Sequence, residues 1–191
     1  MKDWVILFLL DEYTNGLDKV FPDKKEREQA IKDEIERLKD EETVFYELAD
    51  YFNYNFGIDE NNDSKSHIIS VFGSVLADLP EDIFKEIITI QNLFFAFTPR
   101  FGAEVKSFRL EKGSKSGDMI QIVTVPYTSS FLPLDAARGE IAHDLAQIYL
   151  KHKYGSKKET EEEADELAKN WGFDEEIEAY RNYEANEWQQ S

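Results

Sequence analysis

The side chains of this chain that are best suited to chemistry lie in one short segment, at His143, Asp144 and Gln147. An imidazole can bind a metal ion or transfer a proton, and a neighbouring carboxylate can act as a general base. Hydrophobic spacing predicts a helix from Leu134 to about Lys153, which carries all three residues. At about 100° per residue, the three side chains fall within about 100° of one another, and Glu140 can share their face.

The segment resembles the active-site helix of the zincin metallopeptidases, in which the pattern H-E-x-x-H places a glutamate base between two zinc-binding histidines. Its counterpart here is Ile141-Ala142-His143-Asp144-Leu145-Ala146-Gln147. Downstream, Glu161-Glu162-Glu163-Ala164-Asp165 resembles the E-x-x-A-D helix of these enzymes, and Trp171-Gly172-Phe173 resembles the segment that follows it. The resemblance covers roughly residues 78–175 and indicates the small gluzincin type, the minigluzincins.

The resemblance implies a role for each residue of this set. His143 and Glu161 would be metal ligands, and Asp144 would stand at the position of the general base. Gln147 would stand at the position of a lost ligand, and Asp165 would orient a ligand from behind. Because a neutral amide is a poor zinc ligand, we expect either no cofactor or a weakly bound divalent metal, zinc if any.

Other groups do not replace the missing ligand. His152 lies nine residues after His143, about 180° around the helix and therefore on its opposite side. Glu140 could add an oxygen, but an oxygen-rich site suits Mg²⁺, Ca²⁺ or Mn²⁺ better than zinc. Asp144 is one methylene shorter than a glutamate, and a displacement of about 1 Å can cost on the order of 10²-fold in rate.

These residues leave three functional hypotheses open. The first is a catalytically impaired zincin-like protein, a pseudopeptidase, that binds a peptide or protein partner by strand addition. The second is an active metal-dependent peptidase with an altered site, in which Asp144 is the base and His143 and Glu161 bind the metal. The third is a non-enzymatic acidic interaction protein.

Charge and composition limit the classes of partner. The chain of 191 residues has a net charge of −18, of which residues 1–64 contribute −10 and residues 156–191 contribute −8. Such acidity disfavours nucleic acid as a partner. The apolar run at residues 4–10 is too short for a membrane span, which needs about 20 residues. The absence of cysteine excludes disulfides and is compatible with the cytoplasm, the location that we expect.

The predicted elements run from helices through a small sheet to further helices. Helices are expected at 23–40, 42–56, 67–79, 80–92, 134–153, 159–170 and 174–187, and strands at 93–98, 104–110 and 119–125. We expect an α+β fold: a small, mainly antiparallel sheet with a zincin-like active-site helix and flanking helices, preceded by an N-terminal helical segment. The polar run at 57–64 predicts a boundary between an acidic N-terminal helical segment (1–64) and a zincin-like α+β domain (65–191).

Overall fold

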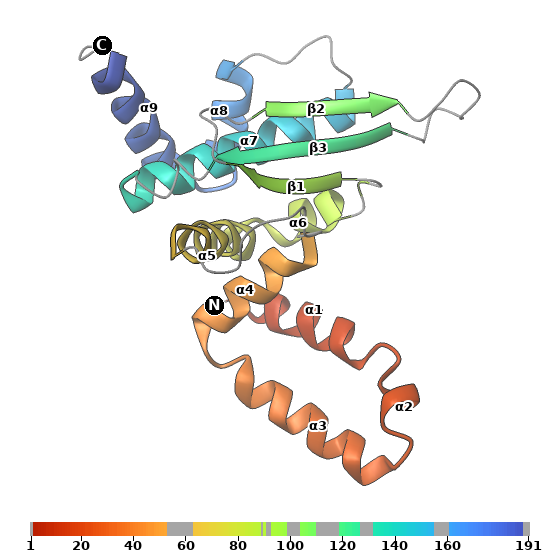
Figure 1. The fold of residues 1–191 in the computed structure, drawn as a ribbon. Coiled ribbons are helices and arrows are strands. Elements are labelled where there is room, and N and C mark those ends of the chain that lie inside the picture. The colour runs from red at the N-terminus through yellow and green to blue at the C-terminus, as the bar shows by residue number, and fades with distance from the viewer. Residues whose placement is uncertain are drawn as a thin grey trace.

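A computed structural model of the chain describes residues 2–52, 63–88, 90, 93–98, 104–109, 119–126, 132–154 and 161–188. The helices are α1 (Asp3–Thr14), α2 (Leu17–Val20), α3 (Lys24–Arg37), α4 (Glu41–Phe52), α5 (Asp63–Asp78), α6 (Glu81–Ile88), α7 (Leu134–Tyr154), α8 (Glu161–Asn170) and α9 (Asp174–Trp188). The strands are β1 (Leu93–Thr98), β2 (Glu104–Arg109) and β3 (Met119–Pro126). Figure 1 shows α1–α4 at one end of the molecule, α5 and α6 in its middle, and the sheet with α7, α8 and α9 at the other end.

Side-chain caps fix where two helices of the N-terminal segment begin. The Asp23 carboxylate accepts hydrogen bonds from the backbone N–H groups of Lys25 (2.8 Å) and Glu26 (3.2 Å) and so caps the N-terminus of α3. Asp40 precedes α4 and accepts from the N–H and the hydroxyl of Thr43, at 2.8 and 2.6 Å. These hydrogen bonds hold the pKa of Asp40 below its ordinary value.

The three strands form one sheet in the order β1-β3-β2. β2 pairs antiparallel with β3, with Ser107 opposite Gln121. β1 pairs parallel with β3, with Phe95 opposite Val123. The central position therefore belongs to β3, the longest strand and one rich in β-branched residues. In Figure 1, α7 runs behind this sheet.

The predicted α+β fold class is wrong. Nine helices hold most of the described residues, so the sheet is a minor part of the fold. The sheet is also not mainly antiparallel, because β1 pairs in parallel with β3 and does not pair with its sequence neighbour β2. Local hydrophobic patterns indicate where a strand lies but not which strand pairs with it, and the prediction failed on that point. None of the helices in the described ranges has the combined length and apolarity that crossing a membrane requires.

A single hydrophobic core extends from α1 to α9. Helix α5 supplies most of its middle, because nearly every side chain from Ile68 to Ala77 is buried. Buried members of the core from along the chain include Val5, Leu48, Phe72, Phe84, Leu145 and Ile177. The N-terminal helices therefore share their core with α5–α9. The predicted boundary at 57–64 falls mostly on residues outside the described ranges and stays a prediction.

The crossing of α4 and α5 depends on Gly73. A Cβ atom built at this position would overlap the backbone carbonyl of Phe45, so a glycine is needed for the two helix backbones to approach this closely. Because α4 carries the buried Val44 and Leu48, this close approach determines how the N-terminal helices join the common core.

Replacing Gly73 with alanine tests this crossing. Helix propensity alone predicts a more stable protein, since alanine is favoured over glycine in a helix by about 1 kcal/mol. Because the added methyl group would displace α4, we expect instead a loss of about 1–3 kcal/mol in the free energy of unfolding, measured by urea denaturation. A midpoint that stays the same or rises would show that α4 shifts freely.

Candidate functional site

The close crossing of α7 and α9 brings the candidate site together. Gly139 on α7 faces the backbone of α9, where a Cβ atom on this residue would overlap the carbonyl of Glu176. One turn further along each helix, His143 follows Gly139 and Tyr180 follows Glu176. The rings of His143 and Tyr180 are consequently close, with their centroids 6.1 Å apart.

The turn between α8 and α9 sets the direction of α9. Gly172 has a φ of 103°, a left-handed conformation that favours glycine. The N–H of Phe173 donates to the carbonyl of Ala168 (3.2 Å) and the N–H of Gly172 to that of Lys169 (2.9 Å), which is the Schellman pattern that ends a helix. Phe173 is buried, so the turn is anchored in the core and α9 starts from a fixed point.

Arg138 links α9 to α7 and α5 beside this crossing. Its guanidinium donates to the Ser74 hydroxyl and the Asp78 carboxylate, both at 2.7 Å, and to Glu176 at 3.3 Å. It also lies over the Phe173 ring, 5.7 Å from the centroid. Three helices are thereby tied together one turn before the candidate site.

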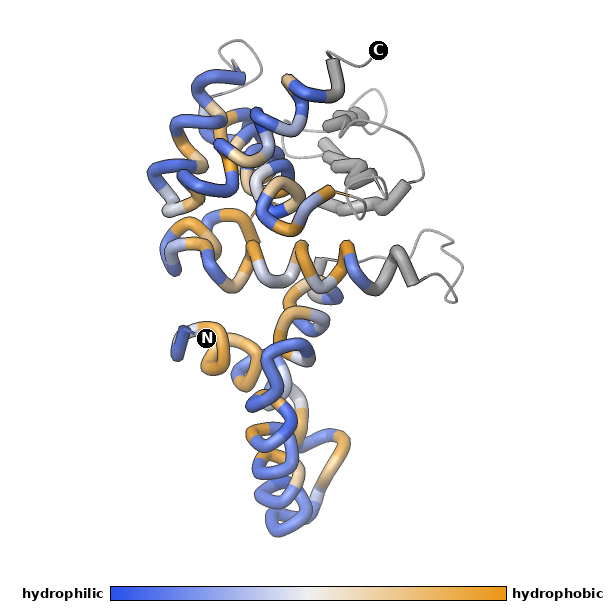
Figure 2. The backbone as a smooth tube through the Cα atoms, turned by 90° about the vertical axis from the view of Figure 1, so that its left-hand side faces the viewer, coloured by the Kyte–Doolittle hydropathy of each residue, from blue (hydrophilic) through white to orange (hydrophobic). Residues whose placement is uncertain are grey.

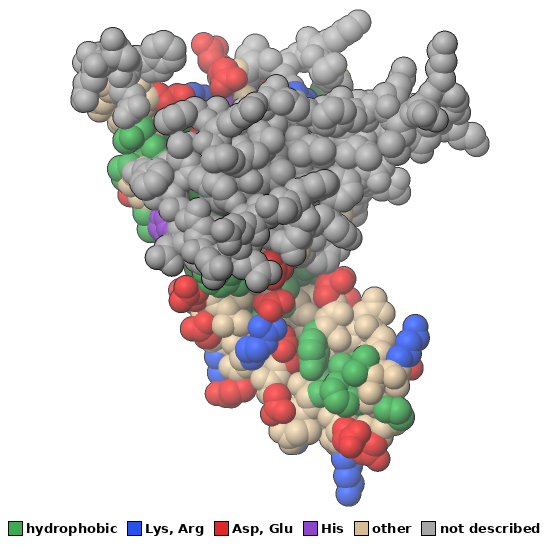
Figure 3. Space-filling model, in the orientation of Figure 1, with side chains coloured by type: hydrophobic (Ala, Val, Ile, Leu, Met, Phe, Trp, Pro, Cys, Tyr) green, Lys and Arg blue, Asp and Glu red, His purple; other side chains and the backbone are tan. Residues whose placement is uncertain are grey.

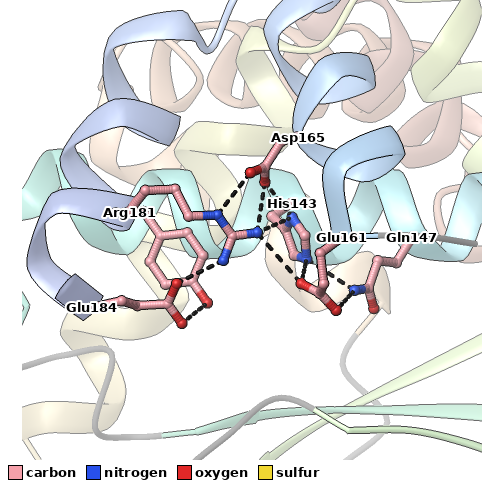
Figure 4. Close-up of polar contacts among 7 residues, drawn as sticks. His143, Gln147, Glu161, Asp165, Arg181 and Glu184 are labelled. Atoms are coloured by element: carbon pink, nitrogen blue, oxygen red, sulfur yellow. Dashed lines mark hydrogen bonds and ion pairs between the residues drawn. The ribbon is translucent and has the colours of Figure 1, made fainter. Parts of the chain in front are cut away.

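His143 is buried, with 3% of its side chain exposed, and both ring nitrogens have partners (Figure 4). Nδ1 lies 2.7 Å from Oδ1 of Asp165 on α8. Nε2 lies 2.9 Å from the amide nitrogen of Gln147 and 3.0 Å from Oε2 of Glu161. Because a carboxylate can only accept, a neutral His143 ring donates from Nδ1 to Asp165 and accepts from Gln147 at Nε2. A protonated ring would donate from Nε2 to Glu161 instead.

Gln147 joins α7 to the start of α8. The same amide nitrogen that contacts His143 donates to Oε1 of Glu161 at 3.0 Å. The carboxylate of Glu161 thus receives the amide on one oxygen and faces the imidazole with the other. At the position where the resemblance places a lost metal ligand, Gln147 acts as a hydrogen-bonding bridge.

Helix α9 adds a cation that the sequence-based set of site residues lacked. Arg181 donates from Nε and Nη2 to the two carboxylate oxygens of Asp165, at 2.7 and 2.8 Å, which is a bidentate ion pair. Nη2 also lies 3.4 Å from Glu161 and 3.3 Å from Nδ1 of His143. Its remaining nitrogen, Nη1, donates to Glu184 at 2.6 Å. Figure 4 shows the guanidinium lying between α9 and the Asp165–His143 pair.

These contacts determine the charges of the cluster. Burial would raise the pKa of Asp165, but hydrogen bonds from Arg181 and His143 outweigh it and hold that pKa below its ordinary value. Burial would lower the pKa of Arg181, but its hydrogen bonds to Asp165 and Glu184 raise it. Burial raises the pKa of the Tyr180 hydroxyl, and the negative charge of Glu184 adds to the rise. Asp165 and Arg181 are therefore an ionised pair at neutral pH.

Asp144 lies in a different environment from its neighbour His143. It is buried, and its Oδ2 has no hydrogen-bond partner among the described residues. Burial raises its pKa well above the ordinary value for an aspartate, and the negative charges of Glu140 and Glu161 add to the rise. An unpaired buried carboxyl of this kind destabilises the folded state when it ionises.

The structure brings most of the predicted site residues into contact. Four of them form one hydrogen-bonded set: His143, Gln147, Glu161 and Asp165. Asp144 is adjacent to His143 in sequence but is buried outside this set. His152 is exposed and also lies outside the set, as expected from the helix geometry. Sequence reasoning missed Arg181 and Glu184. Their i, i+3 spacing indicates an ion pair on α9, but nothing local in the sequence indicates that Arg181 also reaches Asp165.

Comparison with known proteins gives no support to the zincin resemblance. No protein-family model matches the chain, and neither a curated protein nor a solved structure matches it. Within the described ranges, no group of three or more His, Asp or Glu side chains could hold a metal ion.

The recognition of this chain as a zincin-like metallopeptidase, with a degenerate active-site motif, is therefore wrong. The residues on which the resemblance rested lie together because they contact one another. Nε2 of His143, the atom that would bind a metal, contacts Gln147 and Glu161 instead. The assignments of His143 and Glu161 as ligands and of Asp144 as the base lose the resemblance on which they rested, and those roles stay predictions.

Arg181→Gln tests whether the cluster holds the last three helices together. In this variant the Asp165 carboxylate keeps its contact with His143 but loses both hydrogen bonds from Arg181. Because Arg181 is partly exposed, we expect a moderate loss of about 1–3 kcal/mol in the free energy of unfolding, measured by urea denaturation. Arg27→Gln on α3 is the matched control and should change stability by less than about 0.5 kcal/mol. Equal effects of the two variants would contradict a stabilising role for the cluster.

Asp144→Asn tests the buried carboxyl through the pH dependence of stability. Because the pKa of Asp144 is raised in the folded state, the unfolded chain loses this proton at a lower pH than the folded chain. The contribution of Asp144 to the free energy of unfolding of the parent should therefore fall as the pH rises from about 4, the ordinary value for Asp, through the folded pKa. The stability of Asp144→Asn relative to the parent should accordingly increase with pH in urea titrations. A difference that is constant with pH would contradict the raised pKa.

Proposed function

We propose that this chain is a non-catalytic acidic protein that binds a basic peptide or protein partner. The observation that carries the proposal is the position of Arg181, whose guanidinium pairs with Asp165 and lies beside Glu161 and His143. The polar cluster contains a cation of its own. Both ring nitrogens of His143 and both members of the Asp165–Arg181 ion pair have partners inside the cluster. Such internal pairing favours a structural role for the cluster, as a link between α7, α8 and α9.

The outer surface supports the choice of a cationic partner. Helix α8 begins with three exposed acidic residues, Glu161–Glu163, and α9 begins with Asp174 and Glu175, also exposed. With a net charge of −18, the chain attracts positively charged partners and repels polyanions. For a divalent metal we expect weak binding at most, because the imidazole and the amide of the cluster already have partners within the chain.

Binding of a synthetic amphipathic peptide tests this proposal. The probe is a fluorescein-labelled helical peptide of leucine and lysine, and its matched control carries glutamate in place of every lysine. We expect the lysine peptide to raise the fluorescence anisotropy on binding, and the glutamate peptide to leave it unchanged. The affinity for the lysine peptide should fall several-fold as the ionic strength rises from about 0.05 M to about 0.5 M, because salt screens the exposed charges.

A measurement of zinc separates this proposal from metal-dependent hydrolysis. Elemental analysis of the purified chain should give far less than one equivalent of zinc, and no chelator-sensitive cleavage of peptides should be found. Stoichiometric zinc that disappears in His143→Ala, together with such cleavage, would replace the proposal with a metallopeptidase.

A further inference from the structure

Helix α1 is more apolar than its buried contacts require. Residues 4–10 are seven consecutive apolar residues, which span two helical turns and so point in every direction around the helix. Figure 2 shows this run as a hydrophobic stretch beside the N-terminus. A helix that is apolar on all sides is normally enclosed on all sides. In α1, Val5 and Leu9 are buried one turn apart on a single side, and Trp4, Ile6, Phe8 and Leu10 are half-buried against the core, so Leu7 is the exposed apolar residue of the run.

The inward side of α1 has a defined partner. Trp4 and Phe8 pack on Phe84 of α6, with ring centroids 4.8 and 5.1 Å apart. Lys2 fastens the same end, because its ammonium donates to the carbonyls of Asp78 and Leu79 at 2.6 and 2.9 Å. These contacts fix which side of the helix is turned toward the core, and therefore which side is turned away.

The outward α1 face, defined by Asp3, Leu7 and Asp11, lies on the opposite side. Leu7 is about 200° around the helix from Val5, and 66% of it is exposed. A second large apolar side chain, Val20 of the neighbouring α2, is 68% exposed. Figure 3 shows hydrophobic side chains gathered over α1 and α2 on one face of the molecule, with charged groups around them.

The charges on the outward α1 face are negative. Asp3 and Asp11 lie one turn before and one turn after Leu7, and both are exposed. The last turn of α1 holds no basic residue, and Lys2 is directed to the end of α5. A complementary surface therefore presents an apolar side chain to Leu7 and a cationic side chain about one turn away on each side.

We infer that the outward α1 face is the docking surface for a cationic amphipathic helix of a partner protein. This inference rests on the proposed function and gives it a location. A helix with leucine-like residues at i, i+3 and i+4 and with Lys or Arg flanking them has the required pattern. A second copy of this chain fits less well, because it would bring two pairs of aspartates together and two molecules that each carry a charge of −18.

Leu7→Glu tests the apolar part of the surface, with the leucine–lysine peptide as the probe. Leu7 is outside the core, so the variant should fold, as circular dichroism will verify. We expect its affinity for the peptide to fall about tenfold or more, as for a central interface residue. The matched control is Leu134→Glu, which adds the same charge at an equally accessible leucine, 53% exposed, at the start of α7. This control should bind within about twofold of the parent.

An Asp3→Asn/Asp11→Asn double variant tests the charged part. Removing both aspartates should weaken the lysine peptide several-fold and reduce the salt dependence of its binding. The control pair Glu166→Gln/Glu178→Gln removes the same charge from exposed positions on α8 and α9 and should have little effect. Equal losses from the two double variants would overturn the assignment of the face and leave only a general attraction to acidic protein.

The outcomes separate this inference from the proposed function. If the parent does not bind the lysine peptide, the proposed function fails. If the parent and Leu7→Glu bind it equally, the proposed function stands and the location is wrong. Sedimentation velocity gives the remaining outcome: a parent dimer that becomes monomeric in Leu7→Glu would show that a second copy covers the face, and would overturn the inference.

Discussion

The close approach of α7 and α9 at Gly139 is the constraint on which the polar cluster depends. Only a glycine lets the backbone of α9 pass at this distance, and the position of Arg181 relative to His143 and Asp165 follows from it. The Schellman turn at Gly172 fixes where α9 begins, and Arg138 fastens the same crossing to α5. The hydrogen bonds of the cluster thus rest on backbone geometry established by two glycines and one half-buried guanidinium.

Two aspartates near this crossing show how the surroundings decide the chemistry of a carboxyl group. Asp165 receives two hydrogen bonds from Arg181 and one contact from His143, and these outweigh the effect of burial on its pKa. Asp144 lies next to His143 in sequence but has no cation in direct contact among the described residues, and burial raises its pKa. Asp165 on α8 is therefore half of a stabilising ion pair, whereas Asp144 on α7 favours its neutral form.

The sequence was sufficient to locate most elements, because those signals are local. The helices predicted at 23–40 and 134–153 overlap α3 and α7 closely. The parallel pairing of β1 with β3 and the contact of Arg181 with Asp165 join residues far apart in the chain, and no local pattern specifies such contacts. The likeness to a peptidase helix was misleading for the same reason. Spacing placed His143, Gln147 and Glu161 correctly on their helices. The chemistry open to these side chains depends on which groups they contact in the folded chain, and spacing does not specify those contacts.

The position of Arg181 also has a consequence for the order in which the chain assembles during synthesis. His143 and Asp165 leave the ribosome before the helix that supplies their cation, since a chain is made from its N-terminus. Until α9 emerges, Asp165 lacks its bidentate partner and Gly139 lacks the helix that packs against it. The arrival of α9 therefore completes the ion pair and covers Gly139 in one step, so the α7–α9 region cannot finish folding before α9 has been made.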